Sequence, residues 1–255
     1  MDGTSGDTDY AARGAGYARM RRPDPRIAAV LHAALGDART VLNVGAGAGS
    51  YEPADRYVVP VEPSPTMRAQ RPAHLAPAVD AVAAELPYDD GSFDAAMALV
   101  TAHQWPDPVA GLRELRRVAR GPVLVLTFDP AALDRFWLAA YAPELIAAER
   151  RRYPPLDVVG AAIGARCAVT DIRIPLDCTD GVTEAYYGRP ERLLEEPVRR
   201  AQSAWAHIAE PGAEAAAVAR LRAALADGSW DARYGHLRRQ PEYVGSWRLL
   251  VGTPA

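Results

Sequence analysis

The stretch Val41-Leu42-Asn43-Val44-Gly45-Ala46-Gly47-Ala48-Gly49-Ser50 decides the fold, because an apolar run leads directly into alternating glycines. The run has the length and composition of a short buried strand. Glycine lacks the Cβ that would keep a ligand off the backbone, and it permits the positive φ values of a tight turn from strand to helix. The stretch therefore predicts a strand and a loop that binds a nucleotide-like ligand. A plain tight turn is the alternative interpretation.

The spacing of the glycines separates two classes of nucleotide-binding loop. Dinucleotide enzymes favour G-x-G-x-x-G, whose last glycine would fall at Ser50, whereas Gly45, Gly47 and Gly49 follow G-x-G-x-G. The spacing therefore disfavours an NAD-type oxidoreductase.

Strand-like and helical patterns alternate along the rest of the chain. Strands are expected at 41–44, 57–61, 78–82, 94–100, 122–128, 168–174 and 243–251. Helices are expected at 25–35, 109–119, 133–151 and 156–163, with a helical block from 183 to about 226. This order predicts an α/β fold with a doubly wound, mostly parallel seven-stranded sheet, in which ligands gather at the carboxyl ends of the strands.

No linker divides the chain, so we expect a single domain over residues 1–255. Its core would comprise about 25–130 together with 165–176 and 243–252. Helical insertions at about 131–164 and 183–240 would form a lid.

Composition limits the function classes. The chain of 255 residues is 49% hydrophobic and 24% charged, with a net charge of −3, and this disfavours nucleic acid as a partner. No apolar run reaches the roughly 18 residues of a membrane span, and the N-terminus lacks a signal-peptide pattern, so we expect a cytoplasmic protein without a membrane partner. The two cysteines and five histidines show no zinc spacing, and no metal is expected. The absence of lysine is typical of a bacterium with GC-rich codons.

Glu62 ends the predicted strand Tyr57–Val61. A carboxylate at the tip of the second strand of a doubly wound sheet can accept two hydrogen bonds from the vicinal hydroxyls of a ribose. A solvated acid in a loop is the alternative.

Several motifs together resemble class I S-adenosylmethionine (SAM)-dependent methyltransferases of the UbiE-like small-molecule group. They are the glycine stretch, Glu62, Leu86-Pro87-Tyr88 and Ser92-Phe93-Asp94, and the match covers roughly residues 15–128. The resemblance implies a Rossmann-like methyltransferase fold, SAM as cofactor and S-adenosylhomocysteine as product. It also implies that Gly45, Gly47 and Gly49 surround the methionine part, and that Glu62 binds the ribose.

Two positions depart from the family's pattern. Asn43 stands where the family usually has an acid, and its amide oxygen can still accept a hydrogen bond from the SAM ammonium. The acid that contacts adenine in the family is replaced by Val82, so we expect adenine to be bound by backbone amides near Ala83. Val100, at the end of the fourth predicted strand, is also expected beside the cofactor.

An N-terminal helix in related enzymes carries a pattern similar to Tyr17-Ala18-Arg19-Met20-Arg21. The resemblance implies that Tyr17 and Arg21 contact the cofactor, with the Arg21 guanidinium on the SAM carboxylate. The alternative is an exposed arginine on a basic helix.

His103 directly follows the fourth predicted strand and is the candidate catalytic residue. An unperturbed imidazole titrates near pH 6.5, which suits a general base at neutral pH. A cofactor-lining role and a structural role remain open.

The helical insertions are expected to supply the acceptor pocket. Candidate substrate-binding residues are Trp137, Tyr141, Tyr186 and Trp205, although aromatic side chains at helical spacing also occur in cores. The polar run 177–181 is either a helix cap or an edge of the acceptor pocket.

Three functions remain in view. The first is SAM-dependent methyl transfer to O, N or C of a small molecule, for example in specialised metabolism. The second is a SAM-binding protein without methyl transfer, a regulator or another kind of catalyst. The third is the disfavoured NAD-type oxidoreductase. The sequence does not indicate the oligomeric state or the acceptor.

Overall fold

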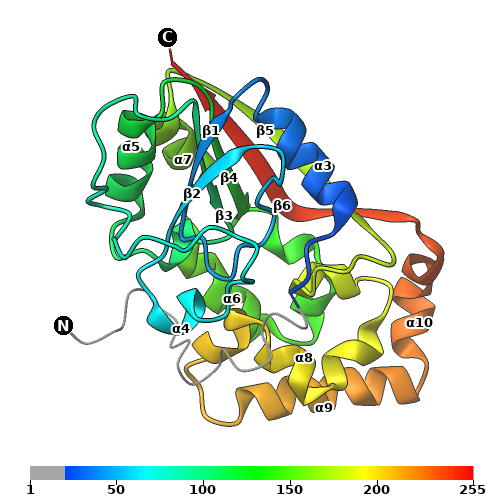
Figure 1. Cartoon of the computed structure of the whole chain (residues 1–255). Coiled ribbons are helices and arrows are strands. Elements are labelled where there is room, and N and C mark those ends of the chain that lie inside the picture. Colours follow the sequence, from blue (N-terminus) through cyan, green and yellow to red (C-terminus); the bar gives the residue numbers. More distant parts are fainter. Residues whose placement is uncertain (1–20, 255) are drawn as a thin grey trace.

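The computed structural model describes residues 21–254, and its centre is a six-stranded sheet (Figure 1). The strands are β1 (Thr40–Val44), β2 (Tyr57–Val61), β3 (Ala95–Leu99), β4 (Val123–Phe128), β5 (Arg166–Pro175) and β6 (Glu242–Thr253). Their order is β2-β1-β3-β4-β6-β5; β1 to β4 pair in parallel, and β6 runs antiparallel to β4 and β5. The predicted α/β fold with a largely parallel sheet is confirmed. Tyr17 lies outside the described residues.

The prediction of a seventh strand at 78–82 was wrong. Only Val79 pairs there, in a single parallel bridge to Val61. Two hydrogen bonds flank this bridge: Val79 N–H donates to the Pro60 carbonyl at 2.9 Å, and Glu62 N–H donates to the Val79 carbonyl at 3.0 Å. Val79 and Val82 are 39% and 48% exposed, so this segment at the sheet edge gains little apolar burial from a longer ladder.

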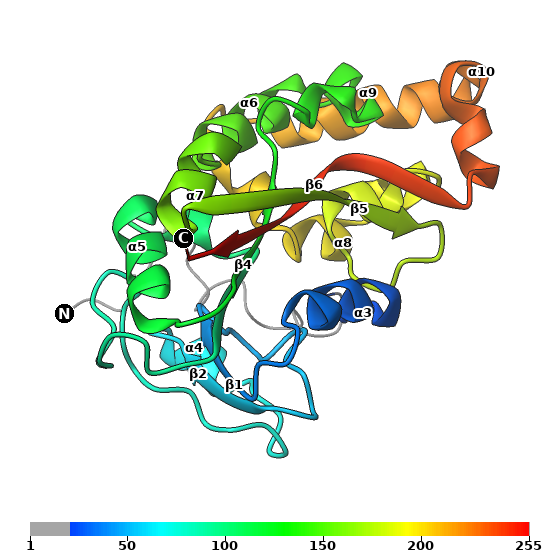
Figure 2. The same cartoon turned by 90° about the horizontal axis from the view of Figure 1, so that it is seen from above.

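Helices cover both faces of the sheet (Figure 2). On one face α3 (Pro25–Ala34) packs Ile27 and Leu31 into the same core cluster as Val41. On the other face α5 (Pro108–Val118) and α7 (Leu156–Ile163) pack with Leu42. Adjacent residues of β1 thus point to opposite cores, as the two-residue repeat of a strand requires.

The predicted single helix at 133–151 is broken in the structure. It comprises the short turns η2 (Leu133–Arg135) and η3 (Trp137–Ala140), followed by α6 (Pro143–Arg152). Pro143 begins α6, because its ring lacks an N–H and disfavours helical geometry at the preceding residue. Ala142 accordingly has φ −136° and ψ 58°.

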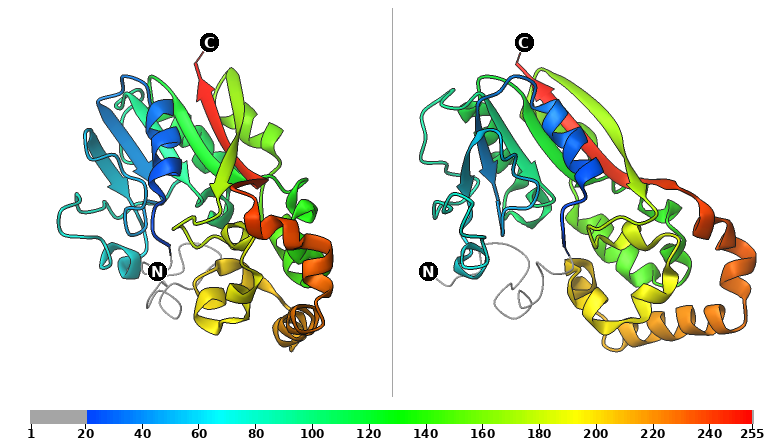
Figure 3. Two further views of the ribbon diagram at one scale, coloured as in Figure 1. Left: turned by 90° about the vertical axis from the view of Figure 1, so that its right-hand side faces the viewer. Right: turned by 45° about the vertical axis from the view of Figure 1, so that its right-hand side comes forward.

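The two insertions gather beyond the carboxyl ends of the parallel strands (Figure 3). The second insertion consists of short elements followed by a longer helix and further turns. These are η4 (Thr183–Tyr186), η5 (Pro190–Leu194), α8 (Glu196–Arg200), η6 (Ser203–His207), α9 (Ala213–Ala226), α10 (Ser229–Tyr234) and η7 (Gly235–Arg239). Within residues 21–254, no helix has both the length and the apolar character to cross a membrane.

Candidate active site

A cavity of about 640 Å³ opens at the carboxyl ends of β1, β2 and β3. Its wall is formed by the glycine loop, by residues 62–65 and 80–84, and by the segment that follows β3. The volume lies within the usual range of ligand pockets. The cavity stands where ligands bind in doubly wound sheets, and we call it the cofactor cavity.

The three glycines of the loop have different tasks. All have positive φ, +68° at Gly45, +52° at Gly47 and +92° at Gly49. A Cβ on Gly45 would lie 2.1 Å from Thr101 Oγ1, and one on Gly49 would lie 2.3 Å from Leu75 Cδ1. Gly45 and Gly47 line the cavity. Gly47 thus keeps the backbone accessible to a ligand, whereas Gly49 chiefly permits packing inside the protein.

Glu62 joins the glycine loop to the end of β2. Its Oε2 accepts the Gly47 N–H at 2.9 Å, and its Oε1 accepts the Ser64 N–H at 2.8 Å. The side chain is 8% exposed and lines the cavity, and burial raises its pKa above the ordinary glutamate value. A carboxylate offers about four acceptor positions, so one on each oxygen remains for a ligand with two adjacent hydroxyls.

Asn43 is buried at the base of the loop and lines the cavity. Its Nδ2 donates to Glu52 Oε1 at 2.9 Å, and Glu52 forms a buried ion pair with Arg71 at 2.8 Å. Arg71 also donates to the Gly47 carbonyl at 3.3 Å. The network supports the loop from behind and leaves the Asn43 amide oxygen as the acceptor for a ligand.

A second polar group closes the cavity on the side of the insertions. Arg21 Nε donates to Asp180 Oδ1 at 2.6 Å, and the Tyr51 hydroxyl donates to Asp180 Oδ2 at 2.8 Å. All three residues line the cavity, and Asp180 is 2% exposed. The polar run 177–181 therefore contributes a cavity carboxylate. Sequence reasoning noticed the run but did not select Asp180 or Tyr51.

The adenine segment and the end of β3 complete the wall. Ala83 is 7% exposed, and both Ala83 and Val82 line the cavity. Val100 has φ +55°, an unusual conformation for a β-branched residue, and its N–H donates to the Leu126 carbonyl at 2.8 Å. This turn of the backbone leads the chain from β3 into η1 (Ala102–Gln104).

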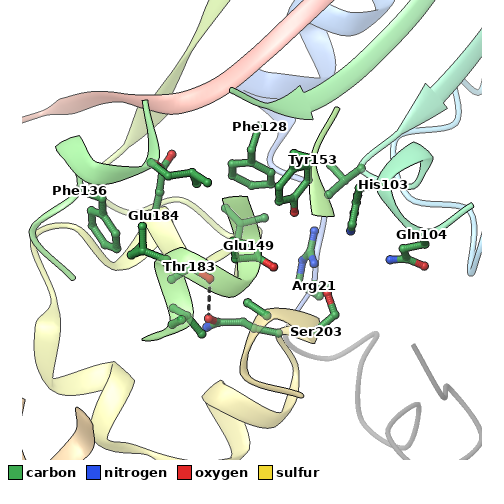
Figure 4. Close-up of a pocket in the computed structure, with 17 residues that line it drawn as sticks. Arg21, His103, Gln104, Phe128, Phe136, Glu149, Tyr153, Thr183, Glu184 and Ser203 are labelled. Carbon is green, nitrogen blue, oxygen red and sulfur yellow. Dashed lines mark hydrogen bonds between the residues drawn. The ribbon is translucent and has the colours of Figure 1, made fainter. Parts of the chain in front are cut away.

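A smaller chamber of about 50 Å³ adjoins the cofactor cavity (Figure 4). The two share Arg21, Val100 and Gln104 in their walls. The rest of the chamber comes from η1, from β4 and from the two insertions. We call it the acceptor chamber, because it adjoins the cofactor cavity and much of its wall comes from the two insertions.

His103 lines the acceptor chamber and is 6% exposed. Its ring contacts the ring of Tyr153 with centroids 4.4 Å apart, and the Tyr153 phenol hydrogen-bonds the Glu149 side chain. Burial and the Glu149 charge raise the pKa of Tyr153 well above the usual tyrosine value, so its phenol stays protonated. Figure 4 shows the rings of His103 and Tyr153 next to each other.

Glu184 is a further carboxyl group in the chamber wall. Its Oε1 accepts from the Ser246 N–H at 2.9 Å and from the Ser246 hydroxyl at 2.8 Å. Burial raises its pKa above the ordinary glutamate value. The chamber wall thus contains two glutamates, of which Glu149 pairs with Arg152 and Glu184 is bound to Ser246.

The four aromatic residues predicted for substrate binding lie outside the linings of both cavities. Trp137 Nε1 donates to the Tyr187 carbonyl at 2.9 Å, and its ring packs on Tyr141. Tyr186 is 6% exposed beside Arg189, and Trp205 Nε1 donates to Gln202 Oε1 at 3.2 Å. Their substrate role stays a prediction. The walls are instead formed by residues that the sequence did not single out, including Phe128, Phe136, Tyr153, Gln202 and the two glutamates.

Comparisons with known proteins agree with this geometry. The family model of a methyltransferase domain matches residues 42–125. No curated protein sequence matches the chain. The matched residues span β1 to the middle of β4, with the glycine loop and Glu62 between them, so this part of the chain is similar to a methyltransferase domain. The UbiE-like subgroup remains a prediction.

Three solved structures are similar. One, from Anabaena variabilis, is described as a candidate methyltransferase from an antibiotic biosynthesis pathway; it is 28% identical with TM-score 0.83, covering 92% of this chain and 99% of that one. A SAM-dependent methyltransferase from Thermotoga maritima, a possible histamine N-methyltransferase, is 15% identical with TM-score 0.55 and covers 95% of both chains. The geranyl diphosphate C-methyltransferase from Streptomyces coelicolor, in complex with Mg²⁺, geranyl diphosphate and S-adenosylhomocysteine, is 16% identical with TM-score 0.50, covering 90% and 78%.

Proposed function

We propose that the protein binds SAM in the cofactor cavity and transfers its methyl group to O, N or C of a small molecule in the acceptor chamber. The observation that carries the proposal is that the two cavities adjoin, since Arg21, Val100 and Gln104 line both. A methyl donor on one side of this boundary would face an acceptor on the other. The family match and the similar structures support the choice of cofactor.

The residues present fit SAM. Gly47 presents bare backbone, Glu62 retains acceptor positions for the ribose hydroxyls, and the Asn43 oxygen can accept from the ammonium. Arg21 could pair with the SAM carboxylate. It would do so either in place of its ion pair with Asp180 or in addition to it. Ala83 would contact the adenine through its backbone, with Val100 beside the methyl-bearing end.

Catalysis requires little beyond alignment, exclusion of water and removal of one proton from a hydroxyl or ammonium acceptor. The bound SAM would supply a sulfonium that already carries its leaving group. His103 would take the acceptor proton, and its place in the acceptor chamber, outside the cofactor cavity, favours this role over cofactor binding. The Tyr153 ring would hold the imidazole in place.

Two measurements test the proposal. Calorimetry should show binding of S-adenosylhomocysteine but not of NAD. Transfer of a labelled methyl group should then be found on a panel of small hydroxyl, amine and carbon acceptors, including intermediates of specialised metabolism. Binding without transfer to any acceptor would favour the second function, a SAM-binding protein that does not methylate.

Glu62→Ala is expected to weaken S-adenosylhomocysteine binding by about 1.5 to 3 kcal/mol, because two charge-assisted hydrogen bonds to the ribose are lost. Isothermal titration calorimetry measures the change. Glu85→Ala is the control, since Glu85 is an exposed acid nearby that does not line the cavity. An unchanged dissociation constant for Glu62→Ala would remove Glu62 from the ribose site.

The same carboxylate predicts a pH dependence of binding. Burial raises the pKa of Glu62, and the ribose hydroxyls need the ionised form as acceptor. Affinity for S-adenosylhomocysteine should therefore be constant above the raised pKa and fall as the pH drops through it. Titrations from neutral pH down to about pH 4.5, the ordinary glutamate range, would reveal the fall. Glu62→Gln should flatten the curve; equal slopes in the two proteins would contradict the assignment.

A further inference from the structure

Gln202 lies in the wall of the acceptor chamber, and the oxygen of its side-chain amide already accepts hydrogen bonds. The residue is 3% exposed. Its Oε1 accepts from the Thr183 hydroxyl at 2.7 Å, the bond drawn at Thr183 in Figure 4, and from Trp205 Nε1 at 3.2 Å. Two side chains of the second insertion thus hold the amide in one orientation.

The orientation of this amide is fixed by chemistry. An indole N–H can only donate, so the Gln202 atom that faces Trp205 must be the oxygen. The Nε2 group then occupies the other side of the amide. Within residues 21–254, this buried atom has no acceptor at hydrogen-bond distance. An unsatisfied buried donor costs about 1 to 3 kcal/mol, and such a group calls for a specific explanation.

The remaining lining indicates which kind of group could satisfy Nε2. The charged groups of the wall already have partners: Arg21 pairs with Asp180, and Glu149 pairs with Arg152. Both carboxylate oxygens of Glu184 accept from the Ser246 N–H. An anion placed there would find both Arg21 and Arg152 already paired with carboxylates. An uncharged oxygen needs no such cation to accept from Nε2.

The size of the chamber limits the bound group. Its volume of about 50 Å³ accommodates roughly four waters, which corresponds to a functional group and not to a whole drug-sized ligand. Phe128 and Phe136 add apolar walls. The chamber therefore suits the end group of an acceptor that carries one polar oxygen on a small apolar carbon frame.

We propose that Gln202 Nε2 donates a hydrogen bond to an uncharged carbonyl or hydroxyl oxygen of the methyl acceptor and thereby positions it beside the boundary with the cofactor cavity. This inference rests on the proposed methyl transfer. It also assigns Trp205 and Thr183 as positioning residues, which act through Gln202.

Nuclear magnetic resonance of glutamine side-chain amides tests the contact directly. The full chain, ¹⁵N-labelled at glutamine and saturated with S-adenosylhomocysteine, is titrated with three probes of nearly equal shape: acetone, isobutene and acetate. The Gln202 signal is assigned by its absence from the Gln202→Met spectrum. Gln104, which also borders the chamber, reports entry of a probe, and Gln240, whose Nε2 donates to the Glu242 carbonyl at 2.7 Å, is the control signal.

Acetone should move the Gln202 amide signal, while isobutene and acetate at the same concentration should not. In Gln202→Glu, the acetone affinity read from Gln104 should fall at least about tenfold, because the donor has become an acceptor. A Gln202 signal that does not respond to acetone, or that moves equally with isobutene or acetate, would overturn the proposal. Binding of S-adenosylhomocysteine and methyl transfer are scored separately, so failure of the proposed function is distinguished from failure of this contact.

Discussion

Gly47→Val is expected to abolish binding of S-adenosylhomocysteine while leaving a folded protein. Gly47 lines the cofactor cavity at φ +52°, and the first atom that a Cβ would meet is Met67 Cε at 3.3 Å. A branched side chain would therefore occupy space where the cofactor must contact backbone. The left-handed conformation costs an L-residue roughly 1–2 kcal/mol, which is below the roughly 5–15 kcal/mol stability of typical domains.

The control for this variant is Gly36→Val. Gly36 has φ +57°, and a Cβ added there would meet no atom within 4 Å apart from its chain neighbours, so the change brings similar backbone strain away from the cavity. Calorimetry should show normal binding for Gly36→Val and none for Gly47→Val, with circular dichroism confirming that both fold. Near-normal affinity in Gly47→Val would remove the cofactor assignment of the loop.

His103→Gln is expected to lower turnover by a factor of about 10² or more while nearly preserving affinity for S-adenosylhomocysteine. Glutamine can fill much of the space of the imidazole but cannot take a proton at neutral pH. A base must be neutral to act, so activity of the unaltered protein should fall at low pH, where the imidazole is protonated. The variant should lose this acidic limb of the profile of kcat/KM against pH.

His236→Gln is the matched control, because His236 lies outside the linings of both cavities. A loss of cofactor affinity in His103→Gln, with the acidic limb preserved, would instead assign His103 to the cofactor pocket. Normal binding and normal turnover would leave the residue a structural role.

The cofactor half of the site could be predicted from the sequence because its parts are local. The glycine loop and Glu62 each stand at the end of a short apolar strand, and strand ends meet at one edge of a parallel sheet. The expectation that Val82 lies in the wall came instead from the resemblance to the methyltransferase family. The predicted strand at 78–82 was wrong. Its apolar composition suits a strand but does not reveal that the segment lies exposed at the edge of the sheet.

The acceptor chamber is formed by contacts between segments that are distant in the sequence. The spacing of apolar residues along the chain does not predict such contacts. Asp180 meets Tyr51 across 129 positions of the chain, and Gln202 reaches its place through Thr183 and Trp205. Of the aromatic residues chosen from the sequence, Trp137 and Tyr141 pack on each other and Tyr186 and Trp205 pack beside arginines. A polar residue such as Gln202 becomes noticeable only when its burial is known.

The backbone of Val100 has a consequence for which residues this position can hold. A non-glycine residue in the left-handed region costs on the order of 1–3 kcal/mol, and the cost is borne at the boundary of the two cavities. Glycine would relieve that energy but would free the segment that carries His103. The exchange would therefore remove backbone strain and backbone rigidity together. Relief of backbone strain at this position is therefore expected to make the boundary of the two cavities less rigid.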